Sequence, residues 1–330
     1  MNLTKLGKIF IEQPKFRIGQ AEKLIFKDLI NDWNQASVFS LELREKLKND
    51  LSLKIDNKLF ISKDNKSAKA IIFLEDGSRI ETALMSHNDG RNTVCLSSQV
   101  GCPLACKFCI SGLNFKRNLT VDEILVQALF WARYLKENNI GRLSNIVFMG
   151  SGEPFLNYDN VLKSINYLNS PDYFDISARK ISISTIGIAE GIRKIVNEKY
   201  QINLAVSLHF INEKKRQEMM PATKKYNLRK MWEAVDYYIH ETNRKVMFEY
   251  ILIKGINDSK KQAEELAILM KKPLYAVNLI KYNKIGDLEP SEREAIIDFR
   301  GVLRNRGVEV IERYRFNDDI FGACGQLVGK

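Results

Sequence analysis

Six short apolar runs recur after residue 90, and they limit the fold more than any other feature of the sequence. They are rich in β-branched residues, alternate with helix-length segments, and occupy residues 93–97, 145–150, 180–184, 203–209, 245–253 and 275–282. Nearly continuous apolar runs of this length are typical of strands buried on both faces of a parallel sheet. Six strand–helix units predict an α/β fold in which the sheet curls into an open six-unit partial TIM barrel, because a closed barrel would need two more units.

Two of the helix-length segments carry start signals. Thr120 and Glu123 have the spacing of a capping box, and the same spacing recurs at Ser291 and Glu294. The residues after Glu123 predict a helix with one buried face, formed by Ile124, Leu125, Ala128, Leu129, Ala132 and Leu135.

The first part of the chain has a different pattern. Residues 20–35 and 40–50 predict two short amphipathic helices, and residues 69–85 predict a hairpin that turns at Asp76-Gly77. We therefore expect a small N-terminal helical accessory domain (1–55), a β-ribbon (56–92) and a partial barrel with a C-terminal cysteine segment (93–330).

Five cysteines are distributed unevenly, with four between residues 95 and 109 and the fifth at Cys324. The N-terminus shows no export signal, and no apolar run approaches the roughly 20 residues that a membrane span needs. We therefore expect a cytoplasmic protein that acts away from membranes. In a reducing compartment, an odd number of cysteines indicates metal binding or catalysis.

Cys102, Cys106 and Cys109 have the spacing C-x3-C-x2-C. Three thiolates on one loop can hold three irons of a 4Fe-4S cluster, which leaves the fourth iron open to a substrate or cosubstrate. The alternative is a zinc site with Cys95 or His209 as a fourth ligand, in a zinc-stabilised RNA-binding protein without catalysis. A brown protein containing iron would exclude that alternative.

Other reactive side chains also follow predicted strands. "GSGEP" (150–154) follows the second run, Ser184 ends the third, and "SLH" (207–209) ends the fourth. The carboxyl ends of parallel strands meet at one edge of a barrel, so we expect these groups to meet the cysteine loop there. The net charge of +11 permits a polyanionic partner, and its densest stretch is residues 213–230. A solvated lysine-rich surface would have the same composition.

The cysteine spacing is the hallmark of the radical S-adenosyl-L-methionine (SAM) superfamily, and the chain resembles that superfamily along the whole barrel. Seven further segments narrow the resemblance to the RlmN/Cfr group of RNA adenine methyltransferases, over roughly residues 15–330. They are "CLSSQVGCPLACKFC", "FKRNLTVDEI", "VFMGSGEP", "AVSLH", "FEYILIKGINDS", "VNLIKYN" and the terminal "ACGQL".

The resemblance implies two cofactors, a 4Fe-4S cluster and SAM, with two SAM molecules used per turnover. Cys324 first takes a methyl group from one SAM, and a radical derived from the second SAM activates that methyl for addition to adenine. Glu81 matches the position of the family's proton acceptor, although a strand carboxylate is normally exposed. Cys95 would then release the product by attacking the Cys324 sulfur, which leaves a transient disulfide.

The resemblance also implies the SAM contacts. Gly152 and Glu153 would hold the ammonium group, while Ser184, Ser207, Leu208 and His209 would line the ribose and methionine. Asn283 would form a hydrogen bond to SAM. For His209 alone, a structural histidine at a strand end would be the ordinary interpretation.

For the substrate, the resemblance implies an adenine of 23S rRNA near the peptidyl-transferase centre and, in many members, the adenine 3′ of the tRNA anticodon. We expect the base to leave its stack, and residues 115–118 and 214–230 to track phosphates. Methylation at C2 is favoured over the Cfr-type C8 reaction that confers antibiotic resistance. A monomer and an electron donor such as flavodoxin or ferredoxin are also expected.

Overall fold

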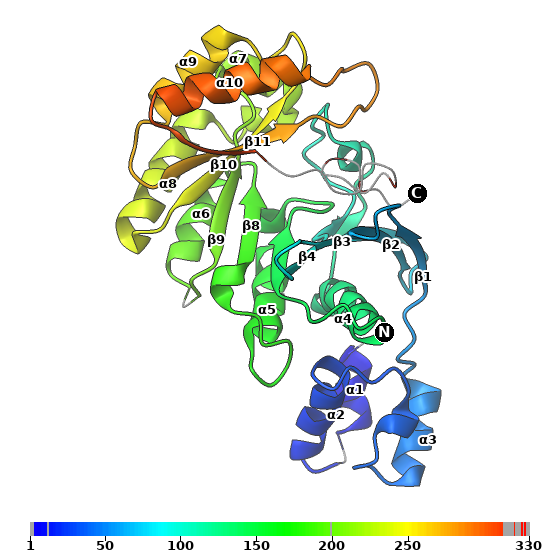
Figure 1. Ribbon diagram of the computed structural model, residues 1–330. Coiled ribbons are helices and arrows are strands. Elements are labelled where there is room, and N and C mark those ends of the chain that lie inside the picture. Colours follow the sequence, from blue (N-terminus) through cyan, green and yellow to red (C-terminus); the bar gives the residue numbers. More distant parts are fainter. Residues whose placement is uncertain are drawn as a thin grey trace.

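The computed structural model describes residues 3–11, 13–198 and 200–312, together with Ile320, Gly325 and Leu327. Within these residues the chain folds around a ten-stranded mixed sheet (Figure 1). Its parallel part contains strands in sequence order: β4 (Asn92–Cys95), β7 (Asn145–Phe148), β8 (Ile181–Thr185), β9 (Asn203–Ser207), β10 (Val246–Leu252), β11 (Tyr275–Lys281) and β12 (Glu309–Glu312). This arrangement confirms the predicted α/β partial barrel.

All six predicted runs form strands of this parallel sheet, from β4 to β11. The last strand, β12, was not predicted. It is four residues long, begins and ends with glutamate, and buries only Val310. An edge strand with one covered position lacks the continuous apolar run that identified the others.

The predicted ribbon extends the sheet beyond β4. Strand β2 (Ser67–Phe73) pairs antiparallel with both β1 (Asn57–Ile61) and β3 (Arg79–Ser86), and β3 pairs antiparallel with β4. The hairpin turns at Asp76-Gly77 as predicted, where the Asp76 carboxylate accepts a hydrogen bond from Ser78 N (2.9 Å). The ribbon therefore fixes the register of its side chains against β4.

Helices cover the outside of the parallel sheet: α4 (Val121–Glu137), α5 (Tyr158–Asn169), α6 (Ala189–Val196), α7 (Glu213–Met219), α8 (Leu228–Thr242), α9 (Lys260–Leu269) and α10 (Arg293–Asn305). Short 3-10 turns lie at Ile110–Leu113, Pro154–Asn157, Ala178–Lys180 and Pro221–Lys224, and β5 (Gln99–Val100) pairs with β6 (Arg117–Asn118).

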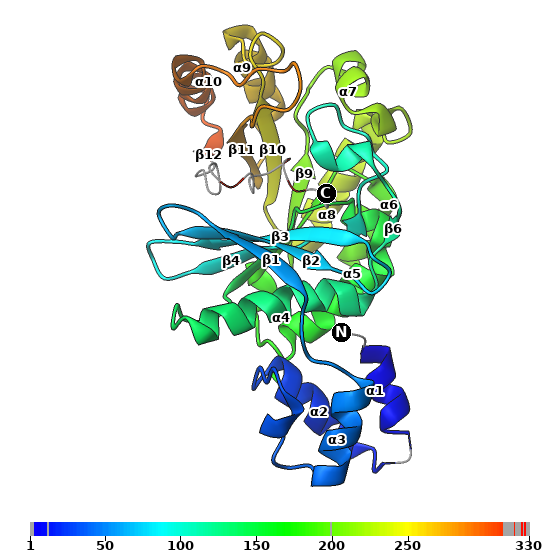
Figure 2. The ribbon, with the colours of Figure 1, turned by 90° about the vertical axis from the view of Figure 1, so that its right-hand side faces the viewer.

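The capping box of α4 forms as predicted, and the six residues of its predicted apolar face are buried. Gln127, Trp131 and Arg133 are buried as well. Figure 2 shows the reason, because α4 lies between the ribbon strands and the N-terminal helices. The second predicted capping box is wrong: the Ser291 hydroxyl donates to the Asp258 carboxylate (2.7 Å), and α10 begins at Arg293 without a side-chain cap.

The N-terminal region contains α1 (Leu3–Ile9), α2 (Phe16–Phe26), a 3-10 turn (Trp33–Gln35) and α3 (Leu41–Asp50). The predicted helix over 20–35 is wrong in extent, because α2 ends at Phe26 and Leu29 has a φ of 61°. Helix α3 matches its prediction, and Ser40 caps it. Among the described residues, no helix has both the length and the apolar character to cross a membrane.

Candidate functional site

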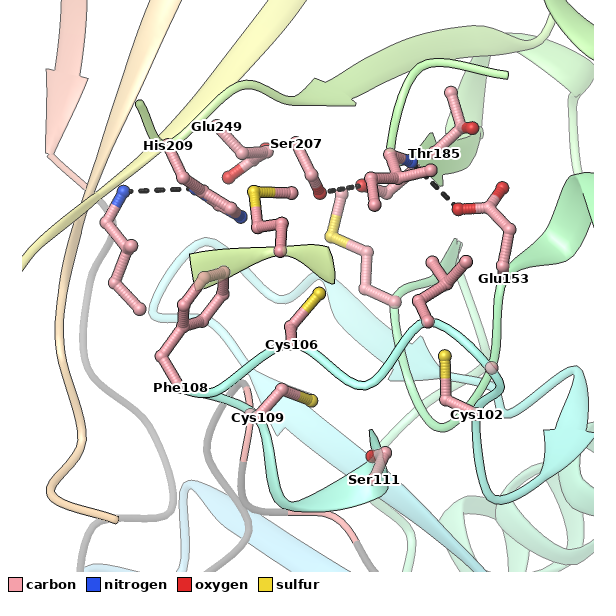
Figure 3. Close-up of a pocket in the computed structure, with 18 of the residues that line it drawn as sticks. Cys102, Cys106, Phe108, Cys109, Ser111, Glu153, Thr185, Ser207, His209 and Glu249 are labelled. Carbon is pink, nitrogen blue, oxygen red and sulfur yellow. Dashed lines mark hydrogen bonds between the residues drawn. The ribbon is translucent and has the colours of Figure 1, made fainter. Parts of the chain in front are cut away.

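A cavity opens at the carboxyl ends of the parallel strands (Figure 3). Loops that follow β4, β7, β8 and β9 form most of its wall, as expected from the connectivity of a parallel barrel. Many of the predicted site residues line it together: Cys102, Cys106, Cys109, Gly152, Glu153, Ser184, Ser207 and His209. Residues separated by 107 positions in the chain therefore share one cavity.

The three thiols lie on the loop between β5 and β6. Backbone contacts hold this loop, since Lys107 N donates to Met219 O (2.9 Å) and Ile110 N donates to Gly325 O (3.0 Å). Burial raises the pKa of Cys102 to about 12, and burial followed by the charge of Cys109 raises the pKa of Cys106. The thiols are therefore protonated near neutral pH in the metal-free chain, and they are close enough to influence one another.

A single zinc ion would need its thiolate ligands close together. Thiolates around one zinc would approach within about 4 Å of one another, because Zn–S bonds are about 2.3 Å long. Among the described residues, no three Cys, His, Asp or Glu side chains converge in this way. Cys102, Cys106 and Cys109 nevertheless border one shared cavity.

Glu153 closes the cavity beside the cysteine loop. Its carboxylate accepts hydrogen bonds from Phe155 N (3.1 Å) and Ile186 N (2.8 Å), which tie the turn after β7 to the end of β8. Burial nevertheless raises the pKa of Glu153 to about 7. A cationic ligand in the cavity would favour the ionised carboxylate.

The opposite wall carries Ser184, Ser207 and His209. The two serine hydroxyls lie 3.4 Å apart. His209 Nδ1 accepts a hydrogen bond from Ile251 N (3.2 Å), so the neutral ring carries its proton on Nε2. Burial, followed by the charge of Arg216, lowers the pKa of His209 to about 3, which keeps the ring neutral. This wall therefore offers hydroxyl groups and one N–H to a polar ligand.

Two predicted SAM contacts lie outside the described lining of the cavity. Leu208 is fully buried, and its backbone N donates to Glu249 O (3.1 Å), so it supports the wall through its main chain. Asn283 is buried two residues after β11.

Cys95 and Glu81 lie on the sheet next to the cavity. Cys95 pairs with Ala83 across β3 and β4, and both pack with Leu327, which lines the cavity. Side chains alternate along a strand, so Glu81 is on the same face as Ala83. Glu81 is buried, with its carboxylate 3.6 Å from Lys69 Nζ, in contrast to an ordinary strand carboxylate. Cys324 lies outside the described residues.

Sequence reasoning missed Glu249, another buried carboxylate in the cavity wall. It lies on β10, and its carboxylate accepts a hydrogen bond from Asn278 Nδ2 (2.9 Å). A signal was available, because a lone acidic residue inside the apolar run 245–253 is unusual for a buried strand.

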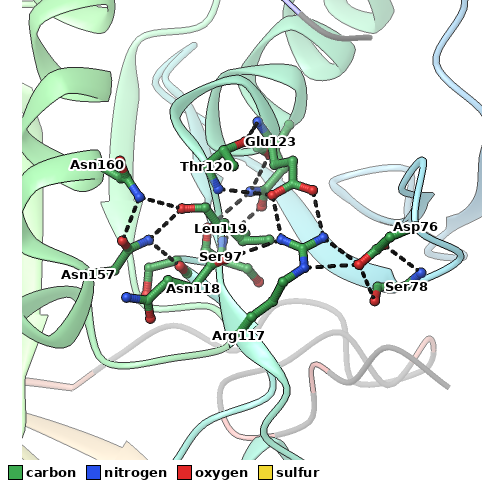
Figure 4. A network of polar contacts seen from close by, with 12 residues as sticks. Asp76, Ser78, Ser97, Arg117, Asn118, Leu119, Thr120, Glu123, Asn157 and Asn160 are labelled. Atoms are coloured by element: carbon green, nitrogen blue, oxygen red, sulfur yellow. Dashed lines mark hydrogen bonds and ion pairs between the residues drawn. The ribbon is translucent and has the colours of Figure 1, made fainter.

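The residues predicted to track RNA phosphates, 115–118 and 214–230, are only partly exposed. Arg117 is held by the carboxylates of Glu123 (2.7 Å) and Asp76 (2.8 Å), so its charge is already paired within the protein (Figure 4). Arg216 is fully buried, so it is not part of the exposed basic surface. The exposed cations of the second stretch are Lys214, Lys224, Lys225, Arg229 and Lys230.

Comparison with known proteins agrees with this geometry. Residues 96–267, a little over half of the chain, match the radical SAM superfamily. A probable dual-specificity RNA methyltransferase RlmN of Clostridium novyi is 40% identical over 320 residues, covering 96% of this chain and 92% of that protein. The protein of the same name from Dictyoglomus turgidum is 40% identical over 318 residues, covering 96% and 91%.

A solved structure shows the same fold throughout. The crystal structure of a radical SAM methyltransferase from Sphaerobacter thermophilus superposes with a TM-score of 0.94 at 36% identity, covering 100% of this chain and 98% of that one. Sequence and fold thus agree over nearly the whole length. The chain belongs to the RlmN family of radical SAM RNA methyltransferases.

Proposed function

We propose that this methyltransferase modifies C2 of an adenine in 23S rRNA, in the peptidyl-transferase region, and the adenine 3′ of the anticodon in tRNA. One observation carries the proposal: Cys95 and Glu81 lie on the sheet face that adjoins the three-thiol cavity. A radical SAM protein that only cleaved SAM would have no use for a second thiol and a buried carboxylate there. The curated relatives are named dual-specificity RNA methyltransferases, which supports two RNA substrates.

The cavity residues have binding roles in this proposal. Cys102, Cys106 and Cys109 hold the 4Fe-4S cluster, and Gly152 with Glu153 receives the SAM ammonium group. Ser184, Ser207 and His209 bind the sugar and methionine, while Leu208 and Asn283 support that wall. When bound, the cluster and SAM supply the radical that lets an electron-poor adenine carbon accept a methyl group. Two SAM molecules are consumed per turnover.

The remaining residues carry the methyl group and release the product. Cys324 sulfur holds the methyl carbon, which gives up one hydrogen atom to the SAM-derived radical and becomes bonded to adenine C2. The adduct then gives up one electron, which the oxidised cluster would take back. Glu81 takes the proton from C2, and the Cys95 thiolate attacks the Cys324 sulfur. The sulfur–carbon bond breaks with its electron pair going to the carbon, which takes up a proton to leave methyladenine and a disulfide. Two electrons then return both thiols. Gly325, which directly follows Cys324, and Leu327 both line the cavity. This supports a role for the C-terminal segment at the site.

The expectations for partners and organisation become part of the same proposal. The chain acts in the cytoplasm as a monomer and receives electrons from a flavodoxin or ferredoxin. Residues 1–55 form the accessory domain, 56–92 the ribbon and 93–330 the catalytic barrel.

The test is anaerobic reconstitution with methyl-labelled SAM and separate rRNA and tRNA fragments. We expect label first on Cys324 and then on adenine C2, and Cys95→Ala should accumulate a covalent protein–RNA adduct. Base-resolved mass spectrometry distinguishes the alternatives. Formation of 8-methyladenine would replace the C2 proposal with the Cfr-type reaction, and unchanged turnover in Cys324→Ala would refute the thiol pathway.

A further inference from the structure

Arg216 lies on α7, behind the wall of the cavity, and its side chain is fully buried. Its guanidinium donates hydrogen bonds to four backbone carbonyls: Ile186 O (2.6 Å), Ser207 O (3.1 Å), Leu208 O (3.2 Å) and Tyr226 O (3.3 Å). Ile186 and Ser207 themselves line the cavity. One cation therefore joins the segments that follow β8 and β9 at the point where they form the site.

The charge of Arg216 is not neutralised by a hydrogen-bonded carboxylate among these partners, which are all neutral carbonyls. The charge of Glu213, one turn away, favours the cationic form of Arg216. The Glu213 carboxylate, however, accepts its hydrogen bonds from Leu228 N (3.0 Å) and Gln217 Nε2 (3.0 Å). Burial lowers the pKa of Arg216 to about 10, which still leaves it cationic at neutral pH. A buried charge of this kind is costly unless an opposite charge compensates it.

Helix α7 also contacts the cysteine loop, which would carry negative charge once a cluster is bound to its thiolates. Helix α7 packs against that loop through Lys107 N and Met219 O (2.9 Å), and the next residue, Met220, lines the cavity and donates its N–H to Arg216 O (2.7 Å). Lys107 directly follows Cys106 in the chain, and two of the carbonyls that Arg216 binds belong to Ile186 and Ser207, which line the same cavity as Cys106. The Arg216 guanidinium thus lies behind the wall of the cavity that the three thiols border.

We propose that Arg216 is the built-in counter-charge of the iron–sulfur cluster and makes its one-electron reduction easier. With three thiolate ligands the oxidised cluster is already anionic, and the added electron makes it more so, without a proton. A fixed positive charge nearby favours the more negative state. The inference goes beyond the proposed function, because it holds for either RNA and for either position of methylation.

Three variants separate charge from position. Arg216→Gln removes the charge but keeps a donor, and Arg216→Lys keeps the charge but loses the planar set of donors. Arg133→Gln is the matched control, because Arg133 is also buried and donates to the backbone carbonyls of Ile30 and Leu53, far from the cavity lining. Reconstituted proteins are titrated anaerobically with dithionite, and the reduced cluster is measured by electron paramagnetic resonance.

We expect the equilibrium constant for reduction to fall at least about tenfold in Arg216→Gln, since an adjacent charge typically shifts a buried ionisation by one unit or more. Arg216→Lys and Arg133→Gln should stay near the wild-type value. A fully loaded Arg216→Gln protein with the wild-type potential would overturn the proposal. If Arg216→Gln fails to hold iron, retention of the cluster in Arg216→Lys supports the role of charge. Loss in both variants overturns it, because hydrogen-bond geometry would then decide.

Discussion

Replacing Gly152 by alanine tests how tightly the turn before Glu153 is packed. Gly152 has a φ of 107°, and a Cβ there would lie 2.6 Å from Gln99 Cβ and 2.7 Å from Ser98 Oγ. Gln99 has little room to move, because its Oε1 accepts from Glu153 N (2.8 Å) and its Nε2 donates to Asn118 Oδ1 (2.7 Å). The backbone conformation should cost roughly 1–3 kcal/mol. The steric contact should add roughly 1–3 kcal/mol to that loss.

Urea unfolding of the metal-free Gly152→Ala protein measures the sum of the backbone and steric losses. Gly90→Ala isolates the backbone contribution. Gly90 has a φ of 82°, yet a Cβ there would meet nothing within 4 Å. We expect Gly152→Ala to lower the free energy of unfolding more than Gly90→Ala by the steric contribution, and to weaken SAM binding by displacing Glu153. Equal losses in the two variants would refute the close approach of Gln99 to this turn.

Three further predictions concern charge and burial. Because the pKa of Glu153 is raised to about 7, its contribution to stability is full below its unfolded value of 4.5 and is lost as pH rises through 7. Urea titrations should therefore show wild type losing roughly 2–3 kcal/mol relative to Glu153→Gln between pH 5 and 8, and parallel pH profiles would contradict this. Iron and sulfide loading should release about three protons at neutral pH in a pH-stat beyond those lost by the sulfide itself, since metal ligation deprotonates thiols and burial raises the pKa of Cys102, Cys106 and Cys109; no excess over the sulfide protons would mean preformed thiolates. Arg133→Met should cost about 2–5 kcal/mol in urea unfolding, because two buried carbonyls lose their donor, and an unchanged midpoint would show that Arg133 does not hold the N-terminal helices.

Six strands of the parallel sheet could be predicted from the sequence because all of their residues are buried or half-buried. That condition favours a largely apolar run, and the segments of β4, β7, β8, β9, β10 and β11 were recognised by it. Ser291 shows where local patterns stop being sufficient. Its spacing to Glu294 equals that of Thr120 to Glu123, but Asp258, 33 residues away, takes its hydroxyl. A long-range partner decided between two local alternatives that look the same in the sequence.

The site could be predicted in part, for a related reason. Groups that follow parallel strands must meet at one edge, so Glu153, Ser184 and His209 could be placed beside the cysteine loop from their order alone. The position of Glu81 depends on the register of β3 against β4, which the sequence does not state. The burial of Arg216 could not be predicted, because the sequence of a lysine-rich stretch does not distinguish a buried cation from an exposed one.

The placement of charge around the cavity explains why Arg216 must lie behind the wall. The cavity itself is lined by three thiols and the carboxylates of Glu153 and Glu249, with the two carboxylates on different sides in Figure 3. SAM carries a sulfonium and an ammonium group, so a cation in the cavity would compete with it for the same anionic surface. Behind the wall, Arg216 donates to backbone carbonyls, two of which belong to residues that line the cavity. The cluster thus gains a counter-charge while the cavity keeps its attraction for a cationic cosubstrate.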